Sequence, residues 1–153
     1  AVILKEIVVV KTGTSLPSLT ARPGDFEDWI LEGMQIHRDG ARVVDVRSGQ
    51  ALPDYESIAG VVITGSRELV TAHADWSERT AAWLPGVVER GVPTLGICYG
   101  HQLLAYALGG EVGDNPRGLE YGTVEVKQTG PGQGDALLGG LGASLPVQVC
   151  HDQ

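Results

Sequence analysis

The segment of residues 92–104, V-P-T-L-G-I-C-Y-G-H-Q-L-L, places Cys98 between two glycines, directly after a short apolar stretch and directly before a helix-like stretch. This layout is typical of a nucleophile elbow, a strand-to-helix turn so sharp that its central residue adopts strained backbone angles. Gly96 and Gly100 lie two residues on either side of Cys98, where side chains would collide as the strand and the helix approach each other. The segment therefore predicts a strand, a strained turn and a helix.

The predicted turn would leave the Cys98 thiol exposed at the N-terminus of a helix. The positive end of the helix macrodipole favours the thiolate there, and the thiolate is the nucleophilic form. A cysteine after a strand is more often a small buried apolar residue. The neighbouring Gly96, Gly100 and Gln102 favour a nucleophile for Cys98, whereas packing is the simpler interpretation of Cys150.

The composition is typical of a soluble globular domain. The chain has 153 residues, 42% of them hydrophobic and 20% charged, which is enough for one domain with a substantial core. A net charge of −8 without a cluster of Lys or Arg argues against nucleic acid or an anionic membrane as the main partner. Apolar runs such as residues 58–63 are too short to span a bilayer, and no signal peptide opens the chain. Two cysteines are too few for a disulfide scaffold, so we expect a cytoplasmic protein.

Strand-like and helix-like segments alternate over most of the chain. Apolar and β-branched runs predict strands over residues 5–10, 42–46, 60–64, 93–97, 123–126 and 147–149. The alternation predicts an α/β fold, with a mostly parallel sheet covered by helices on both faces. The loops at residues 12–18 and 64–70 should then meet the Cys98 turn at the carboxyl edge of the sheet, where such folds bind ligands. This topology brings Gly65 and Ser66 close to Cys98.

Two of the predicted helices have recognisable start signals. Asp25 predicts the N-cap of the first. The apolar face expected for that helix consists of Phe26, Trp29, Ile30 and Met34. Asp75 predicts the N-cap of the second, with Glu78 completing a capping box. Pro85 should kink or divide this second helix.

Four segments match the motifs of one known family. They are L-G-I-C-Y-G-H-Q-L-L-A (95–105), V-I-T-G-S-R (62–67), L-G-G-E-V (108–112) followed by E-Y-G-T-V-E-V (120–126), and P-V-Q-V-C-H (146–151). Similar segments form the nucleophile motif, the glycine-rich loop, the stretch after the nucleophile helix and a strand near bound glutamine in class I glutamine amidotransferases of the triad type. The chain resembles this family nearly end to end, which implies a three-layer αβα, flavodoxin-like fold.

The resemblance implies hydrolysis of the side-chain amide of glutamine to glutamate and ammonia, with no cofactor. Cys98 matches the nucleophile that forms a γ-glutamyl thioester, and the backbone N–H groups of Tyr99 and Ser66 match the donors of the oxyanion hole. Loss of one such donor typically costs about 100-fold or more in rate. The residues implied to bind the substrate are Gly65, Gln102, Cys150, His151 and Asp152.

The sequence departs from the family's pattern in two places. The glycine-rich loop usually reads Gly-Gly-Pro, and here it reads Gly65-Ser66-Arg67. The family's catalytic histidine and orienting glutamate lie in a later His-Pro-Glu segment, and the chain stops at Gln153 before reaching it. We therefore expect residues 1–153 to form a single domain from which the C-terminal part of the family fold is absent. Among the histidines present, His151 is the best candidate for a general base.

Three functions stay open from the sequence. The first is a glutamine amidotransferase or glutaminase-type hydrolase that uses free glutamine and passes ammonia to an acceptor or a synthetase partner. The second is a γ-glutamyl or peptide thiol hydrolase of the same superfamily. The third is a non-catalytic regulatory or binding domain, favoured if the chain truly ends at Gln153, where an exposed sheet edge would invite a homodimer. No metal site is expected, because no His, Cys or Asp cluster has the spacing of ligands.

Overall fold

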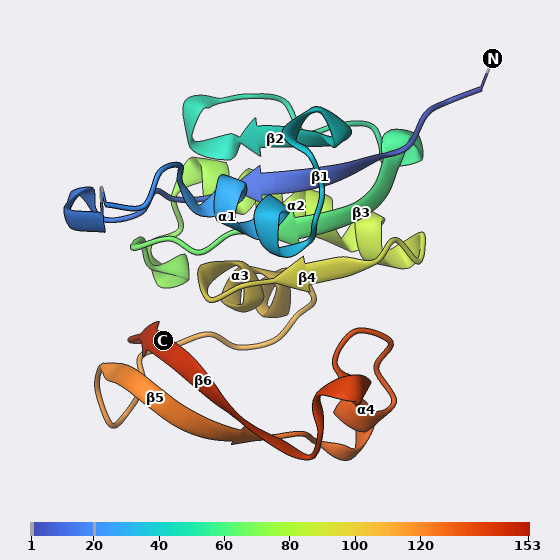
Figure 1. Ribbon diagram of the computed structural model, residues 1–153. Coiled ribbons are helices and arrows are strands. Elements are labelled where there is room, and N and C mark those ends of the chain that lie inside the picture. The colour runs from blue at the N-terminus through green and yellow to red at the C-terminus, as the bar shows by residue number, and fades with distance from the viewer. Residues whose placement is uncertain (1, 20) are drawn as a thin grey trace. The chain divides into compact units, whose positions relative to one another are not determined.

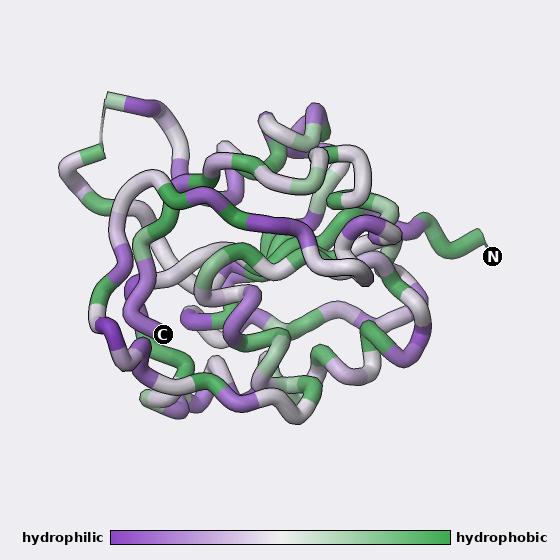
Figure 2. The backbone as a smooth tube through the Cα atoms, turned by 90° about the horizontal axis from the view of Figure 1, so that it is seen from below, coloured by the Kyte–Doolittle hydropathy of each residue, from purple (hydrophilic) through white to green (hydrophobic). Residues whose placement is uncertain are grey.

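The computed structural model describes residues 2–19 and 21–153. The chain forms two compact units, Ala1–Gly113 and Asp114–Gln153. The first unit is a mixed α/β structure, and the second is a two-stranded hairpin with a short helix (Figure 1). The first described residues, 2–4, are hydrophobic and exposed and lead into the first strand (Figure 2). Among the described residues, no helix is both long enough and apolar enough to cross a membrane.

A four-stranded parallel sheet forms the centre of the first unit (Figure 1). Its strands are β1 (Glu6–Lys11), β2 (Ala41–Asp45), β3 (Ile58–Ile63) and β4 (Thr94–Gly96), in the order β2-β1-β3-β4. The chain moves from β1 to β2 on one side and from β3 to β4 on the other, so the strand order reverses between β1 and β3. In parallel sheets ligands bind at the carboxyl ends of the strands next to such a reversal. The predicted parallel α/β fold is confirmed.

Helices cover both faces of this sheet (Figure 1). They are α1 (Phe26–Gly33) on one face, and α2 (Asp75–Glu89) and α3 (Tyr99–Ala107) on the other. Val8 and Val10 of β1 share one buried core with Leu84 of α2 and Leu103 of α3. Val9 is also fully buried and points to the opposite face, because side chains alternate along a strand. The short 3-10 helices are Pro17–Leu19, Arg38–Gly40, Val46–Ser48, Tyr55–Ser57, Val70–Ala72 and Gly139–Leu141.

The face that α1 buries differs from the predicted one. Asp25 is the N-cap of α1, as expected. The sequence pattern predicts an apolar face of Phe26, Trp29, Ile30 and Met34, but the residues that α1 buries are Glu27 and Leu31. The Glu27 side chain is buried because it pairs with the largely buried ammonium of Lys11 at the end of β1. The predicted residues Phe26, Trp29 and Ile30 are half-buried, whereas Met34 is exposed, so the prediction was wrong about which residues are most deeply buried.

The start of α2 also differs from its prediction. Asp75 is the first helical residue rather than the N-cap, and no side chain caps this helix end. Glu78 forms no capping box; its carboxylate accepts a hydrogen bond from the Tyr106 hydroxyl at 2.9 Å and lies 2.6 Å from Nδ1 of His73. These side chains lower the pKa of Glu78 below its usual value, His73 having the larger effect. Pro85 lies within α2 without dividing it.

The second unit consists of β5 (Glu120–Lys127), β6 (Ser144–His151) and α4 (Gly130–Gln133). The two strands are antiparallel and longer than predicted, and Glu120 lies opposite His151 in their register. Nε2 of His151 lies 2.8 Å from the Glu120 carboxylate. Val124 lies opposite Val147, while Tyr121 and Cys150 form a pair on the other face of the hairpin. The hairpin thus has one apolar and one more polar face.

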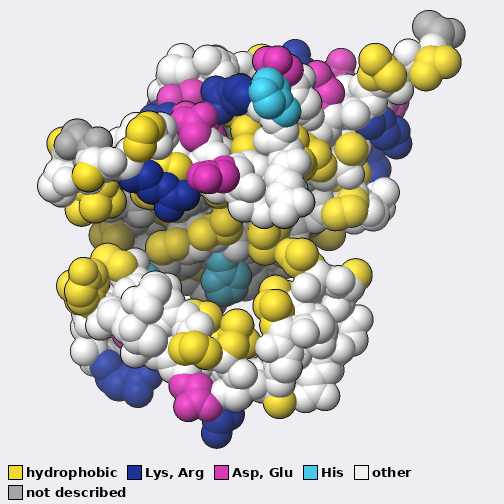
Figure 3. Space-filling view, viewed as in Figure 1, with side chains coloured by type: hydrophobic (Ala, Val, Ile, Leu, Met, Phe, Trp, Pro, Cys, Tyr) yellow, Lys and Arg dark blue, Asp and Glu magenta, His cyan; other side chains and the backbone are white. Residues whose placement is uncertain are grey.

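Basic side chains of the first unit lie among acidic ones on the face shown in Figure 3. Arg22 pairs with Glu32 at 3.0 Å, and Arg38 pairs with Asp28 at 3.3 Å. Phosphate binding needs concentrated positive charge that is free to meet the ligand. The two arginines near α1 already pair with carboxylates, so they do not form a concentrated positive charge that could bind phosphate.

Candidate active site

Cys98 lies in a strained turn between β4 and α3. Its backbone has φ 52° and ψ −109°, a left-handed conformation that residues with a side chain rarely adopt. β4 ends at Gly96 and α3 begins at Tyr99, so two residues make the whole connection. The Cys98 side chain is exposed at the N-terminus of α3. The predicted strand, strained turn and helix are therefore confirmed.

The two flanking glycines are required by close backbone contacts. A Cβ atom on Gly96 would lie 2.6 Å from the carbonyl group of Gly100 and 2.6 Å from the backbone nitrogen of His101. A Cβ atom on Gly100 would overlap the backbone oxygen of Ile63 on β3. Any side chain at either position would push α3 away from the sheet. The steric reason expected for these glycines is confirmed.

Tyr99 anchors the beginning of α3 in the core. Its side chain is 1% exposed, and its ring lies 5.6 Å from that of Trp76 on α2. The Tyr99 and Ser77 hydroxyl oxygens are 2.5 Å apart. Burial raises the pKa of the Tyr99 phenol above its usual value. The N–H groups in the first turn of a helix have no partner within that helix, so the anchored Tyr99 N–H is available as a donor next to Cys98.

The loops after β1 and β3 meet beside the Cys98 turn. A Cβ atom on Gly65 would lie 3.7 Å from Cβ of Cys98, and one on Gly13 would lie only 2.6 Å from Cα of Ser66. The Ser66 hydroxyl oxygen accepts a hydrogen bond of 3.1 Å from the N–H of Glu68. This bond closes the loop locally in a chain that lacks the family's proline at the next position. The expected convergence of the three loops is confirmed.

Two threonines that were not predicted as site residues connect these loops. Thr12 and Thr64 directly follow β1 and β3, and both are fully buried. The Thr12 N–H donates a hydrogen bond of 3.0 Å to the Thr64 hydroxyl oxygen. The signal for them is a repeated Thr-Gly pair after a β-branched run, at residues 12–13 and again at 64–65.

A charged cluster lies at the carboxyl end of β1. Nζ of Lys11 is 2.6 Å from Glu27 and 3.3 Å from Asp25. Burial by itself would lower the pKa of Lys11, but Glu27 and Asp25 together raise it above its usual value. Burial by itself would raise the pKa of Asp25. Hydrogen bonds from the N–H groups of Ser15 and Phe26, together with the Lys11 ammonium, outweigh this effect and lower the pKa below its usual value. One ammonium thus faces two carboxylates, and the cluster joins the end of β1 to the start of α1.

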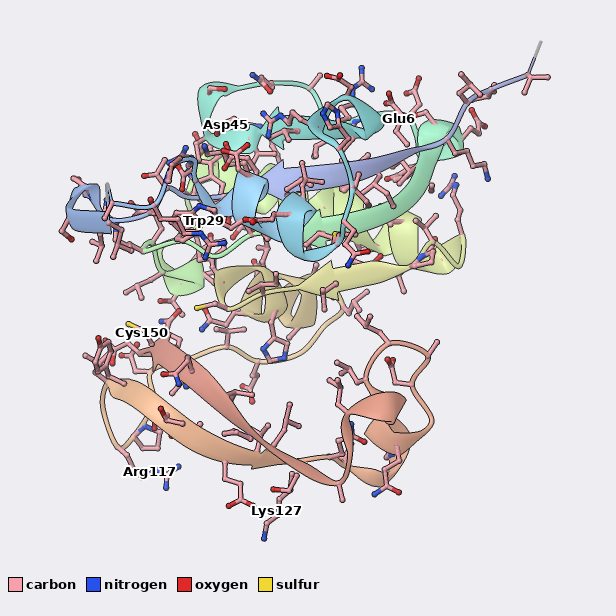
Figure 4. The ribbon with its side chains drawn as sticks, in the orientation of Figure 1. Glu6, Trp29, Asp45, Arg117, Lys127 and Cys150 are labelled. Atoms are coloured by element: carbon pink, nitrogen blue, oxygen red, sulfur yellow. The ribbon has the colours of Figure 1, made fainter. Side chains whose placement is uncertain are left out.

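The remaining predicted substrate residues belong to the second unit. Cys150, His151 and Asp152 lie at and just beyond the end of β6, where Cys150 is labelled in Figure 4. Nε2 of His151 lies 2.8 Å from the Glu120 carboxylate and Nδ1 lies 2.9 Å from the backbone oxygen of Gln153. Each ring nitrogen of His151 therefore faces an oxygen atom of the second unit, one from a carboxylate and one from the backbone.

The other described histidines have partners of their own or lie on α3. His73 faces Glu78, and His37 lies 3.4 Å from the Asp39 carboxylate. His101 follows Cys98 by three residues on α3 and is exposed. Among the described residues, no group of three or more His, Cys, Asp or Glu side chains is placed to hold a metal ion.

Comparison with known proteins identifies the family. The family model for class I glutamine amidotransferases matches residues 36–152. The chain belongs to the class I glutamine amidotransferase family. The glutamine amidotransferase fold is also evident in a crystal structure of a glutamine amidotransferase from Methylobacillus flagellatus, with a TM-score of 0.74 and 26% identity over 97% of this chain. The predicted family and its flavodoxin-like fold are thereby confirmed.

Two relatives in sequence come from the same family. A glutamine-hydrolysing GMP synthase of Aeropyrum pernix is 43% identical over 103 residues, which are 67% of this chain and 18% of that protein. A putative glutamine amidotransferase-like protein of Schizosaccharomyces pombe is 30% identical over 144 residues, covering 83% of this chain and 57% of that protein. This amidotransferase chain thus spans less than two thirds of each relative, and 56% of the Methylobacillus chain.

Proposed function

We propose that this chain hydrolyses the side-chain amide of glutamine, with Cys98 as the nucleophile. The observation that carries the proposal is the left-handed backbone of Cys98 at the N-terminus of α3, with Gly65 packed against it. This turn exposes the thiol and holds it next to two backbone segments that can donate hydrogen bonds. The positive end of the α3 dipole supports the thiolate form.

The reaction follows from the groups around the thiol. The thiolate attacks the amide carbon of glutamine, and the carbonyl oxygen becomes an oxyanion that accepts hydrogen bonds from the N–H groups of Tyr99 and Ser66. The carbon–nitrogen bond then breaks, and the nitrogen takes a proton and leaves as ammonia. Water cleaves the resulting γ-glutamyl thioester, which releases glutamate and restores Cys98.

The substrate contacts form the second part of the proposal. Gly65 and Gln102 would contact the bound glutamine near the thiol, since Gln102 lies one helical turn beyond Cys98 on α3. The resemblance to the family additionally predicts that Cys150, His151 and Asp152 hold its α-amino and carboxylate groups. A relative is named as a glutamine-hydrolysing GMP synthase, which supports an ammonia acceptor on a synthetase domain or subunit as the partner.

Incubation with glutamine tests the function directly. We expect ammonia and glutamate to appear in equal amounts, and no release from asparagine, whose amide is one methylene closer to the α-carbon. The Cys98→Ser variant is the matched control, because it replaces the thiol with a hydroxyl of similar size that does not ionise near neutral pH. Cys150→Ser, at the other thiol, separates loss of the nucleophile from loss of a substrate contact: we expect it to raise KM and to leave a measurable kcat.

The two other functions give different results in the same assay. Release of glutamate from γ-glutamyl peptides but not from free glutamine would replace the proposal with a γ-glutamyl hydrolase. No release from either substrate, by a folded protein whose Cys98 still reacts with iodoacetamide, would favour a non-catalytic binding domain.

A further inference from the structure

We propose that Thr12 and Thr64 are positioning residues that orient the Ser66 N–H toward the oxyanion of the reaction. This inference rests on the proposed function, because it assigns a task to a donor of that oxyanion hole. It goes further by naming two buried side chains, on two different strands, that hold the donor in place. Neither threonine touches the substrate in this proposal.

The two hydroxyls lie within hydrogen-bond distance of each other and of the same carbonyl oxygens, and we assign the hydrogens by the shortest contacts. The Thr12 hydroxyl lies 2.8 Å from the Thr64 carbonyl oxygen, and the Thr64 hydroxyl lies 3.1 Å from the Gly65 carbonyl oxygen. The Thr12 N–H donates to the Thr64 hydroxyl oxygen at 3.0 Å. Each hydroxyl has one hydrogen, so the two hydroxyls hold two successive carbonyl groups.

Those carbonyl groups determine where the next N–H groups point. In a trans peptide the C=O and the following N–H lie in one plane and point in opposite directions. The hydrogen bond to the Gly65 oxygen therefore fixes the direction of the Ser66 N–H, and the bond to the Thr64 oxygen fixes that of the Gly65 N–H. The threonines thus orient the peptide that carries the proposed donor.

The loop is held from a second direction by β1. A Cβ atom on Gly13 would lie 2.6 Å from Cα of Ser66 and 2.8 Å from the Gly65 oxygen, so the backbone after β1 presses directly on this peptide. Buried hydroxyls are costly unless they are hydrogen-bonded, and valine would fill both positions equally well. The chemistry specific to Thr12 and Thr64 is therefore the hydroxyl group rather than the bulk.

The test compares two reagents on Cys98 in Thr12→Val, Thr64→Val, Thr12→Ser and Thr64→Ser. A chloromethyl ketone analogue of glutamine reacts through an oxyanion, which forms when the thiolate adds to the ketone carbon. The sulfur then attacks the adjacent methylene carbon and chloride leaves; the first carbon–sulfur bond breaks as the ketone re-forms, and a thioether remains. Iodoacetamide is displaced at its methylene carbon, iodide leaves, and no oxyanion forms. Both reactions depend on the reactivity of the Cys98 thiolate, but only the first depends on stabilisation of an oxyanion. The rate with the chloromethyl ketone divided by the rate with iodoacetamide therefore measures oxyanion stabilisation. Reactions are run well below the melting temperature of each variant, and labelling is measured on the peptide that contains Cys98.

We expect the rate ratio to follow the hydroxyl group. In both valine variants it should fall by about tenfold or more, since removal of a whole donor typically costs about 100-fold. In the serine variants it should stay within about twofold of the parent, even though serine removes a buried methyl group and lowers the melting temperature. Glutamine turnover should lose kcat in the valine variants with little change in KM.

Other outcomes overturn the inference in distinguishable ways. If the ratio tracks the melting temperature across all four variants, or is unchanged in a folded Thr12→Val protein, the threonines are structural only. If the parent reacts no faster with the glutamine chloromethyl ketone than a free thiol does and releases no ammonia, the proposed function itself fails, and the inference fails with it. If the Thr64→Val protein does not fold, the comparison of Thr12→Val with Thr12→Ser tests the proposal by itself.

Discussion

Nζ of Lys11, at the end of β1, lies 2.6 Å from Oε1 of Glu27 in the first turn of α1, and these side chains are only 13% and 9% exposed. The pair joins the central strand to the helix that covers one face of the sheet. Removal of one partner from a buried pair leaves an uncompensated charge, which costs more than the net value of the pair.

Glu27→Gln should therefore lower the free energy of unfolding by about 2 kcal/mol, because the Lys11 ammonium loses its principal charged acceptor. Urea unfolding at neutral pH measures this difference. Glu32→Gln is the matched control in the same helix, since Glu32 pairs with Arg22 in a contact whose side chains are 73% and 60% exposed. An exposed pair contributes less than about 1 kcal/mol, and equal losses in both variants would contradict the structural role of Glu27.

Asp25 should make stability depend on pH in the acid range. Its pKa is lowered in the folded chain, so its contribution is present above the pKa of the unfolded chain and is lost as pH falls through the folded value. Asp25→Asn keeps a good N-cap but no charge. We expect the stability difference between parent and variant to be constant near neutral pH and to vanish on acidification.

Unfolding free energies at a series of pH values check this prediction. Asp39→Asn serves as the control, because the Asp39 side chain is 91% exposed. A gap between the parent and Asp25→Asn that persists at the lowest pH would show that the Asp25 charge is not its cause.

Gly96→Ala should destabilise the fold by at least about 3 kcal/mol, because the added methyl group meets rigid backbone of Gly100 and His101 at 2.6 Å. Gly33→Ala, at the end of α1, has open space and should raise stability by about 0.5–1 kcal/mol. Thermal unfolding of both variants measures the contrast. A Gly96→Ala protein as stable as the parent would mean that strand and helix can separate without cost.

Tyr99→Phe should lower stability by about 1–3 kcal/mol, because it leaves the buried Ser77 hydroxyl without its partner. The ring still anchors α3, so the backbone N–H of residue 99 stays in place and kcat for glutamine should change little. Tyr121→Phe is the control, since Tyr121 is 80% exposed and this variant should be about as stable as the parent. A large fall in kcat without a fall in stability would assign the phenol a role in the reaction.

Much of the site could be inferred from local sequence. The close contact of Gly96 with Gly100 and His101 lies within one short segment, and the backbone strain at Cys98 follows from the same segment. Gly100 meets Ile63 of β3, a contact that the order of strands predicts. The order of strands and helices similarly predicts that the loops after β1 and β3 meet the Cys98 turn. Both inferences depend on backbone geometry, which is local or set by chain direction.

The errors arose where distant side chains compete. Glu78 stands where a capping box expects it, yet it faces His73 and Tyr106, which the sequence places 5 and 28 residues away. Glu27 stands on what hydropathy alone assigns to the solvent side of α1, and the ammonium of Lys11 draws it inward. Neither partner choice is visible in a window of neighbouring residues.

The sequence by itself determined the parallel α/β fold and the strained cysteine turn, because periodicity, chain order and glycine spacing express backbone constraints. The resemblance of its motifs indicated the family. Only the tertiary structure decided which side chains satisfy one another across strands. The hydroxyls of Thr12 and Thr64 are 52 residues apart and meet at 3.2 Å because β1 and β3 are paired in one register. Buried polar groups must find partners in space, and only the folded chain determines which partners are near.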